Sequence, residues 1–197
     1  MRWFLPPADF MASFVRKRNN EFHLCHPLIP AQEIFEATKT DDPAYELQYW
    51  RFGLMVAQQW RRRLNLPENE EWKDIIEHIA PLPTANGLYL PNATTSNAYT
   101  DDQFRRDHPS VLAAFGVLPA DERIDNKVMR ATFDNIMNKC NGSQRGGWDY
   151  PMMAMTAARL SQPEKAIDAL MMDVQKNTYL VNGHNYPGQT PSSLSTR

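Results

Sequence analysis

The chain lacks the short patterns that most directly assign a function. It contains no CxxC, HExxH, GxGxxG or P-loop sequence, so no motif indicates a metal site or a nucleotide site. No apolar run approaches the roughly 18 residues that a membrane span needs. Residues 1–7 form a segment too short, and too interrupted by proline, for a signal peptide. These absences leave fold and surface chemistry as the guides to function.

Cysteine and charge are also limited. The only two cysteines, Cys25 and Cys140, lie far apart in the sequence, which favours two buried free thiols over a disulfide. The net charge of -2 gives no reason to expect nucleic acid or an anionic membrane as a partner. The 197 residues, of which 42% are hydrophobic, suffice for one domain with a sizeable core. No internal repeat is found, and this disfavours a helical-repeat scaffold.

Apolar residues at helical spacing predict an all-α chain of about seven helices. The clearest case is 44–64, where apolar residues recur every three or four positions and arginines fill the last turn. No segment alternates with a period of two, so no strand is expected. Ser161 and Glu164 form a capping-box pattern for the last helix. The other expected helices span 8–18, 70–80, 109–115, 122–139 and 149–160.

The connections between these helices fall into two groups. If consecutive helices pack as antiparallel neighbours, successive connections lie at alternating ends of the bundle. The short connections then share one end, and the long polar ones share the other. Because function concentrates on elaborate loops at one side of a scaffold, we expect the site at the second end. The long connections are 19–43, 81–108, 141–148 and the segment from 177 onward.

The segment from Gly146 to Asn185 carries the most specific expectation. It begins Gly-Gly-Trp-Asp, continues through two helices with a two-residue break, and ends Asn-Gly-His-Asn. A break so short makes the helices antiparallel, which brings Trp148 and Asp149 near the last turn. A tryptophan, a carboxylate, an imidazole and amides on one rim suit a ligand that is polar with flat apolar faces, such as a sugar. The last-turn residues are Asn182, His184 and Asn185.

Carboxylates on two further loops of that rim, Glu33 and Asp107, could serve as acid and base across a glycosidic bond. Each candidate also has a structural alternative. Glu33 could be a solvated loop residue, and Asp107 could cap the helix that begins at Pro109. In the same way, His108 could be a hydrogen-bonded structural histidine, Asp149 an N-cap and Trp148 a core residue. A tryptophan that follows two glycines is, however, well placed to stack on a ring.

Three segments carry a resemblance to a known family: Asp107–Ser110, Gly147–Leu160 and Asn182–Asn185. Together they resemble the C-terminal part of bacterial six-hairpin glycosidases, which are (α/α)6-toroid glycoside hydrolases. These enzymes are distantly related to 1,2-α-L-fucosidases and to the maltose phosphorylase group. The resemblance covers about residues 21–185, and it is more specific for the superfamily than for the sugar.

The resemblance implies roles for particular residues. The segment Pro30–Glu33 stands where the family carries its general acid, so Glu33 takes that role and Asp107 becomes the candidate base. Most relatives are inverting hydrolases or phosphorylases, for which carboxyl groups roughly 6.5–9.5 Å apart are expected. The implied substrate is an oligo- or polysaccharide, with no metal and no cofactor. The implied substrate-binding residues are His108, Trp148, Asp149, Asn182, His184 and Asn185.

The resemblance also implies an incomplete ring. A six-hairpin toroid needs twelve helices, and about seven are expected here. We therefore predict a partial toroid: residues 1–185 are the C-terminal part of a catalytic domain, and 186–197 a disordered or aberrant tail. Exposed barrel edges would then allow self-association. Relatives are usually exported. The alternative is a non-catalytic carbohydrate-binding or helical interaction module.

Overall fold

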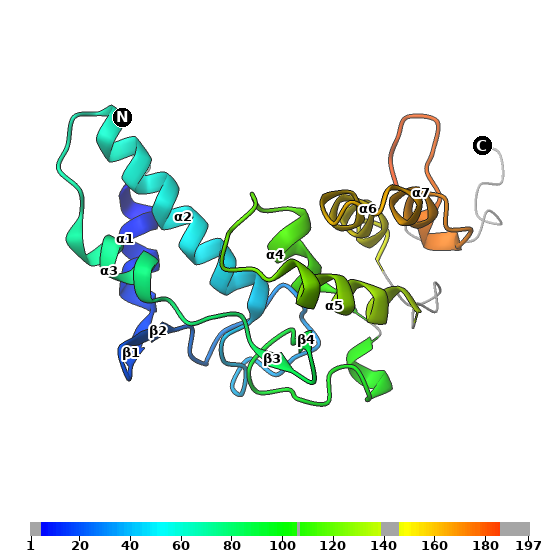
Figure 1. The fold of residues 1–197 in the computed structure, drawn as a ribbon, viewed down its shortest axis with the longest axis horizontal. Helices are drawn as coiled ribbons and strands as arrows, with labels where there is room; N and C mark the ends of the chain where they lie inside the picture. The colour runs from blue at the N-terminus through cyan, green and yellow to red at the C-terminus, as the bar shows by residue number, and fades with distance from the viewer. Residues whose placement is uncertain (1–4, 106, 139–145, 186–197) are drawn as a thin grey trace, which may run out of the picture.

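The computed structural model describes residues 5–105, 107–138 and 146–185. This part of the chain is mostly helical, as predicted, and contains seven α-helices and three short 3-10 helices (Figure 1). The predicted tail, 186–197, and Cys140 lie outside the described residues. The α-helices are α1 Leu5–Phe14, α2 Ala44–Arg63, α3 Glu70–His78, α4 Ala113–Gly116, α5 Asn126–Asn138, α6 Asp149–Arg159 and α7 Pro163–Leu170. The 3-10 helices are η1 Asp102–Arg105, η2 Ser110–Leu112 and η3 Gln175–Asn177.

The chain also forms two small antiparallel hairpins, so the expectation that no strand forms was wrong. Strands β1 (Arg16–Arg18) and β2 (Glu21–His23) are joined by two asparagines, and β3 (Thr84–Ala85) and β4 (Leu88–Tyr89) by Asn86 and Gly87. All four turn residues have positive φ. Asparagine and glycine tolerate that conformation, which two-residue hairpin turns require. β1 also occupies the end of the predicted helix 8–18.

Helix α2 follows its sequence pattern closely. It begins directly after Pro43, has Glu46 in its first turn and three arginines in its last turn. This charge order complements the helix dipole. Leu47, Leu54 and Ala57 on its apolar stripe are buried. The next helix, α3, begins where the Asn69 side chain accepts a hydrogen bond from the Trp72 backbone N–H at 3.1 Å, a standard N-cap.

The expected caps of α6 and α7 do not form. Ser161 adopts a φ of 57° outside α7, and the N-cap residue Gln162 makes no capping bond with its side chain. Asp149 is the first residue of α6, and its carboxylate bonds elsewhere, as described below. The three residues between α6 and α7, one more than the expected break, still place the two helices side by side, as expected (Figure 1).

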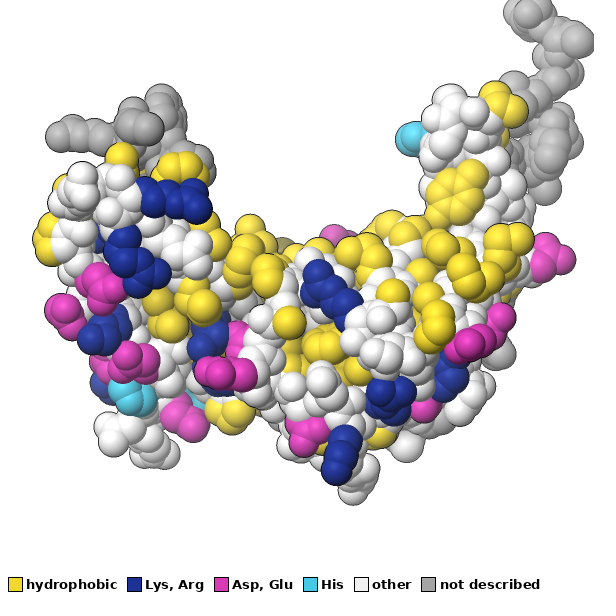
Figure 2. Space-filling view, turned by 45° about the horizontal axis from the view of Figure 1, so that its top comes forward, with side chains coloured by type: hydrophobic (Ala, Val, Ile, Leu, Met, Phe, Trp, Pro, Cys, Tyr) yellow, Lys and Arg dark blue, Asp and Glu magenta, His cyan; other side chains and the backbone are white. Residues whose placement is uncertain are grey.

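The elements form an open crescent. Helices α1, α2 and α3 pack together at one end, α4 and α5 lie in the middle, and α6 and α7 lie at the other end (Figure 1). One cluster of buried side chains joins α1, α2 and α3, and a larger one joins α4, α5, α6 and α7. Figure 2 shows a broad hollow between the two ends, along which hydrophobic side chains gather.

Cys25, the one cysteine within the described residues, is buried and free, as predicted. No described helix is both long enough and apolar enough to cross a membrane.

Candidate functional site

The first two long connections meet along their length. The Gln32 side chain donates to the Phe104 carbonyl at 3.0 Å, and the rings of Phe35 and Phe104 stack at 5.1 Å. The Ile34 backbone N–H donates to the Asp107 carboxylate at 3.1 Å. Because Glu33 precedes Ile34, this contact brings both predicted carboxylates to one junction between the loops. Glu33 itself is exposed there, and Asp107 is partly buried.

A pair formed by the partly buried His108 and the buried Asp149 joins this junction to the third connection. His108 Nδ1 lies 2.8 Å from Asp149 Oδ1, and Asp149 Oδ2 accepts the Gly146 backbone N–H at 2.8 Å. The Asp149 side chain is fully buried. A ligand in solvent therefore cannot touch Asp149, which corrects its expected role as a sugar contact. Its carboxylate instead orients the His108 ring.

The two glycines before Trp148 allow this close approach. A Cβ atom at Gly146 would lie 2.4 Å from His108 Cε1, and one at Gly147 would lie 1.7 Å from Asn185 Oδ1. Both distances are far inside van der Waals contact, so side chains at these positions would displace the histidine and the asparagine. The sequence showed the Gly-Gly pair, and the structure shows why side chains do not fit at these two positions.

Trp148 forms the exposed side of the site. Its side chain is 47% exposed, and its ring centroid lies 4.3 Å from that of His108 with the planes tilted by 36°. A half-exposed indole held against a second ring can offer a flat apolar surface to a ligand. The alternative interpretation of Trp148 as a core residue is therefore wrong.

The electrostatics centre on His108. Its hydrogen bond to Asp149 raises the pKa of the imidazole, which burial lowers in part; the negative charges of Asp149, Asp107 and Glu33 raise it further. His108 Nε2 lies 3.7 Å from Asp107 Oδ1. The same oxygen accepts a hydrogen bond from the His108 backbone N–H at 2.7 Å. Asp107 thus accepts backbone N–H groups on both oxygens, and no capping bond to the following 3-10 helix forms.

The fourth connection reaches the site through one residue. Asn185 lies against Gly147 and also donates to the Lys176 carbonyl at 3.0 Å. Asn182 and His184 are exposed in a small turn beyond it, where the Asn182 side chain accepts the His184 backbone N–H at 3.0 Å. Of the three predicted contacts from this segment, the structure brings Asn185 to the glycines and leaves the other two at the turn.

Two residues near the junction were missed by the sequence analysis. Glu46 accepts the Ala31 backbone N–H at 2.5 Å, while its second oxygen is buried without a partner among the described residues. Burial raises the pKa of the Glu46 carboxyl. Asn135 on α5 likewise buries an unpartnered side-chain nitrogen. Both residues sit in ordinary helical sequence, so only the fold reveals their surroundings.

Together, these contacts place carboxylates, an imidazole and an indole on one rim. In the described ranges no group of three His, Cys, Asp or Glu side chains is arranged to hold a metal ion. A scan against protein-family models found no match to this chain, and a search of curated proteins found none either.

Proposed function

We propose that this chain is a partial (α/α)6-toroid glycoside hydrolase whose rim binds an oligo- or polysaccharide. One observation carries the proposal: the half-exposed Trp148 ring lies against the tilted His108 ring, and Glu33 and Asp107 lie on the adjoining loops. An indole beside carboxylates suits a sugar, because a pyranose has apolar faces and a rim of hydroxyl groups.

In this proposal Glu33 is the general acid and Asp107 the general base. Glu33 gives its proton to the glycosidic oxygen as the bond to the anomeric carbon breaks. Asp107 takes a proton from the water that attacks the opposite face of that carbon, which inverts its configuration. His108 contacts a sugar hydroxyl, and the buried Asp149 keeps its ring in place. Asn185, held beside Gly147, completes the rim.

The apolar surface at the C-terminal end supports the partial-ring proposal. Helices α6 and α7 and the following segment expose a series of large hydrophobic side chains, and Figure 2 shows how such side chains gather along the hollow. In a closed toroid a neighbouring hairpin would cover this surface; in the isolated chain a second copy could do so. The exposed residues are Met155, Ile167, Leu170, Met171, Tyr179, Leu180 and Val181.

Hydrolysis of a panel of aryl glycosides tests the chemistry. Glu33→Gln should reduce turnover by about 10²–10⁴-fold, the usual contribution of a general acid. Glu36→Gln is the matched control, because Glu36 is an exposed carboxylate in the same segment that pairs with Lys39. Equal activity in wild type and Glu33→Gln would remove Glu33 from the mechanism.

A non-catalytic sugar-binding module is the second candidate. It is favoured by the Asp107 carboxylate, since both oxygens already accept backbone N–H groups and are weaker proton acceptors as a result. This candidate predicts that sugars bind to wild type and Glu33→Gln alike, and that neither turns over any aryl glycoside.

A further inference from the structure

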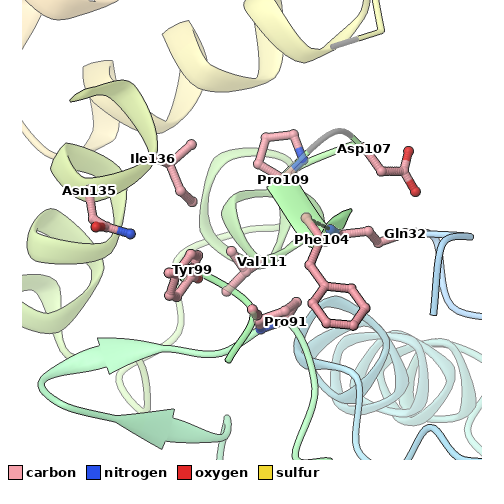
Figure 3. Close-up of a pocket in the computed structure, with 10 residues that line it drawn as sticks. Gln32, Pro91, Tyr99, Phe104, Asp107, Pro109, Val111, Asn135 and Ile136 are labelled. Atoms are coloured by element: carbon pink, nitrogen blue, oxygen red, sulfur yellow. Dashed lines mark hydrogen bonds between the residues drawn. The ribbon is translucent and has the colours of Figure 1, made fainter. Parts of the chain in front are cut away.

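A small cavity lies beside Asp107, on the inner side of the loop junction. Its volume is about 30 Å³. Figure 3 shows it enclosed by the loops and by α5, with Asp107 and Asn135 on opposite sides. Most of its wall is apolar and is formed by Pro91, Ala98, Tyr99, Val111 and Ile136.

One polar group inside this cavity is unsatisfied. The Asn135 side-chain nitrogen is buried and has no hydrogen-bond partner among the described residues. In Figure 3 this nitrogen points toward the middle of the cavity, whereas the Asp107 carboxylate points away from it. A buried N–H donor without an acceptor is costly, so such a group in a pocket indicates a place for an acceptor from outside.

The other polar side chains around the cavity are engaged. Gln32 donates to the Phe104 carbonyl at 3.0 Å and accepts from the Ser110 hydroxyl at 3.4 Å. The Tyr99 hydroxyl donates to the Tyr89 carbonyl at 2.5 Å. Among the described side chains around the cavity, the Asn135 amide nitrogen is therefore the donor without a partner, and it lies beside a mostly apolar surface.

Water suits this chemistry poorly. The cavity has room for about two water molecules, and an ordered buried water makes roughly two to four hydrogen bonds. The Asn135 amide nitrogen can donate to a water but cannot accept from one, and the mostly apolar wall offers few acceptors for the water's own hydrogens. A better occupant has a single acceptor, no donor and a small apolar body. An acetyl group has this form, because its carbonyl accepts and its methyl group is apolar.

We propose that this cavity is a subsite for an acetyl substituent on the bound sugar. The inference rests on the proposed sugar-binding function of the rim. The acetyl carbonyl accepts a hydrogen bond from Asn135 Nδ2, and the methyl group packs against Val111 and Ile136. N-acetyl and O-acetyl groups share this chemistry.

NMR titration of the full chain tests the subsite without assuming where on the sugar the acetyl group lies. N-methylacetamide and methyl acetate serve as amide and ester probes, with the methyl signals of Val111 and Ile136 as the readout. Both probes should shift these signals in wild type, and Asn135→Asp should abolish the shifts because the donor becomes an acceptor. A response to one probe alone identifies the amide or the ester as the source.

Two further variants serve as a matched control and as a substitute for Asn135→Asp. Asn138→Asp adds the same charge to an exposed position on α5 and should leave the shifts intact. If Asn135→Asp does not fold, Ala98→Val narrows the cavity from another side. Shifts that persist in Asn135→Asp, or that never occur in wild type, overturn the subsite.

A second titration distinguishes a failure of the acetyl subsite from a failure of the proposed sugar-binding function. Methyl 2-acetamido-2-deoxyglucoside should bind about tenfold more tightly than methyl glucoside, a difference of about 1.4 kcal/mol. If both glycosides shift the Trp148 signal but no acetyl probe shifts Val111 or Ile136, the subsite is wrong and the sugar site stands. If the acetyl probes bind but neither glycoside shifts Trp148, the sugar-binding rim, and with it this use of the cavity, is wrong.

Discussion

Asp149 and Glu46 are both carboxylates in the first turn of a helix, of α6 and α2 respectively, and they differ in how completely their oxygens are hydrogen-bonded. Asp149 is fully buried, and each of its oxygens has a partner. Glu46 has a partner on one oxygen, and the other is buried without one among the described residues. Both carboxylates interact favourably with the dipole of the helix in whose first turn they lie. The difference in their hydrogen bonding therefore comes from tertiary packing.

This contrast indicates that the packing around Asp149 depends on the charge of its carboxylate. Around Asp149, three segments converge to satisfy one carboxylate, and the result holds His108 against Trp148. Glu46 accepts a single backbone N–H, and it lines a pocket whose other lining residues, Leu24 and Trp50 among them, are apolar. Substitutions that keep the shape and remove the charge should therefore have opposite signs at the two positions.

The largest effect is expected for Asp149→Asn. The amide cannot accept from both His108 and Gly146, and it loses the charge-assisted bond. Chemical denaturation should show a loss of about 2 kcal/mol in the free energy of unfolding, the usual range for bonds to a charged group. An unchanged midpoint and slope would mean that the pair does not hold the rim together.

A smaller effect of opposite sign is expected for Glu46→Gln. The amide oxygen keeps the bond to Ala31, and the cost of burying a charge disappears. At neutral pH the free energy of unfolding should rise by about 1 kcal/mol, within the range of known stabilising substitutions. Lower stability in this variant would show that the buried oxygen has a partner after all.

The pH dependence of stability separates the two groups. The pKa of His108 is raised in the folded state, so its contribution is present below its unfolded value of about 6.5 and is lost as pH rises through the folded value. The pKa of Glu46 is also raised, so its cost grows as pH rises above the unfolded value of about 4.3. Urea midpoints measured from pH 4 to 9 should show both declines.

Each variant should flatten one part of that profile. Asp149→Asn should reduce the decline near neutral pH, and Glu46→Gln should reduce the decline in acid. If both variants keep the wild-type profile, neither group is the source of the pH dependence.

The sequence predicted the elements better than it predicted these surroundings. Hydrophobic spacing located α2 almost to the residue, because its apolar stripe and terminal charges agree. It missed the hairpin at Asn86 and Gly87, since strands of two residues are too short to show a period. It grouped Glu33, Asp107 and Trp148 through loop lengths, and the structure brings their loops together.

The details of the site depend on contacts that no local pattern encodes. The bond between His108 and Asp149 spans 41 positions and depends on how α4 packs on α6. The buried nitrogen of Asn135 becomes unusual only because the fold places it in the wall of a cavity that the loop near Tyr99 also lines. Helix spacing assigns these residues to a face, whereas their partners come from the fold.

Titration of the full chain with an oligosaccharide mixture, with the Trp148 indole signal as readout, tests the central claim most directly. The account predicts a saturable shift, and an affinity about tenfold weaker in Trp148→Ala, or about 1.4 kcal/mol. Trp60→Ala, which changes a tryptophan on α2 at the far end of the crescent, should bind like wild type. If no oligosaccharide shifts Trp148, or if Trp148→Ala binds as tightly as wild type, the rim is not a sugar site.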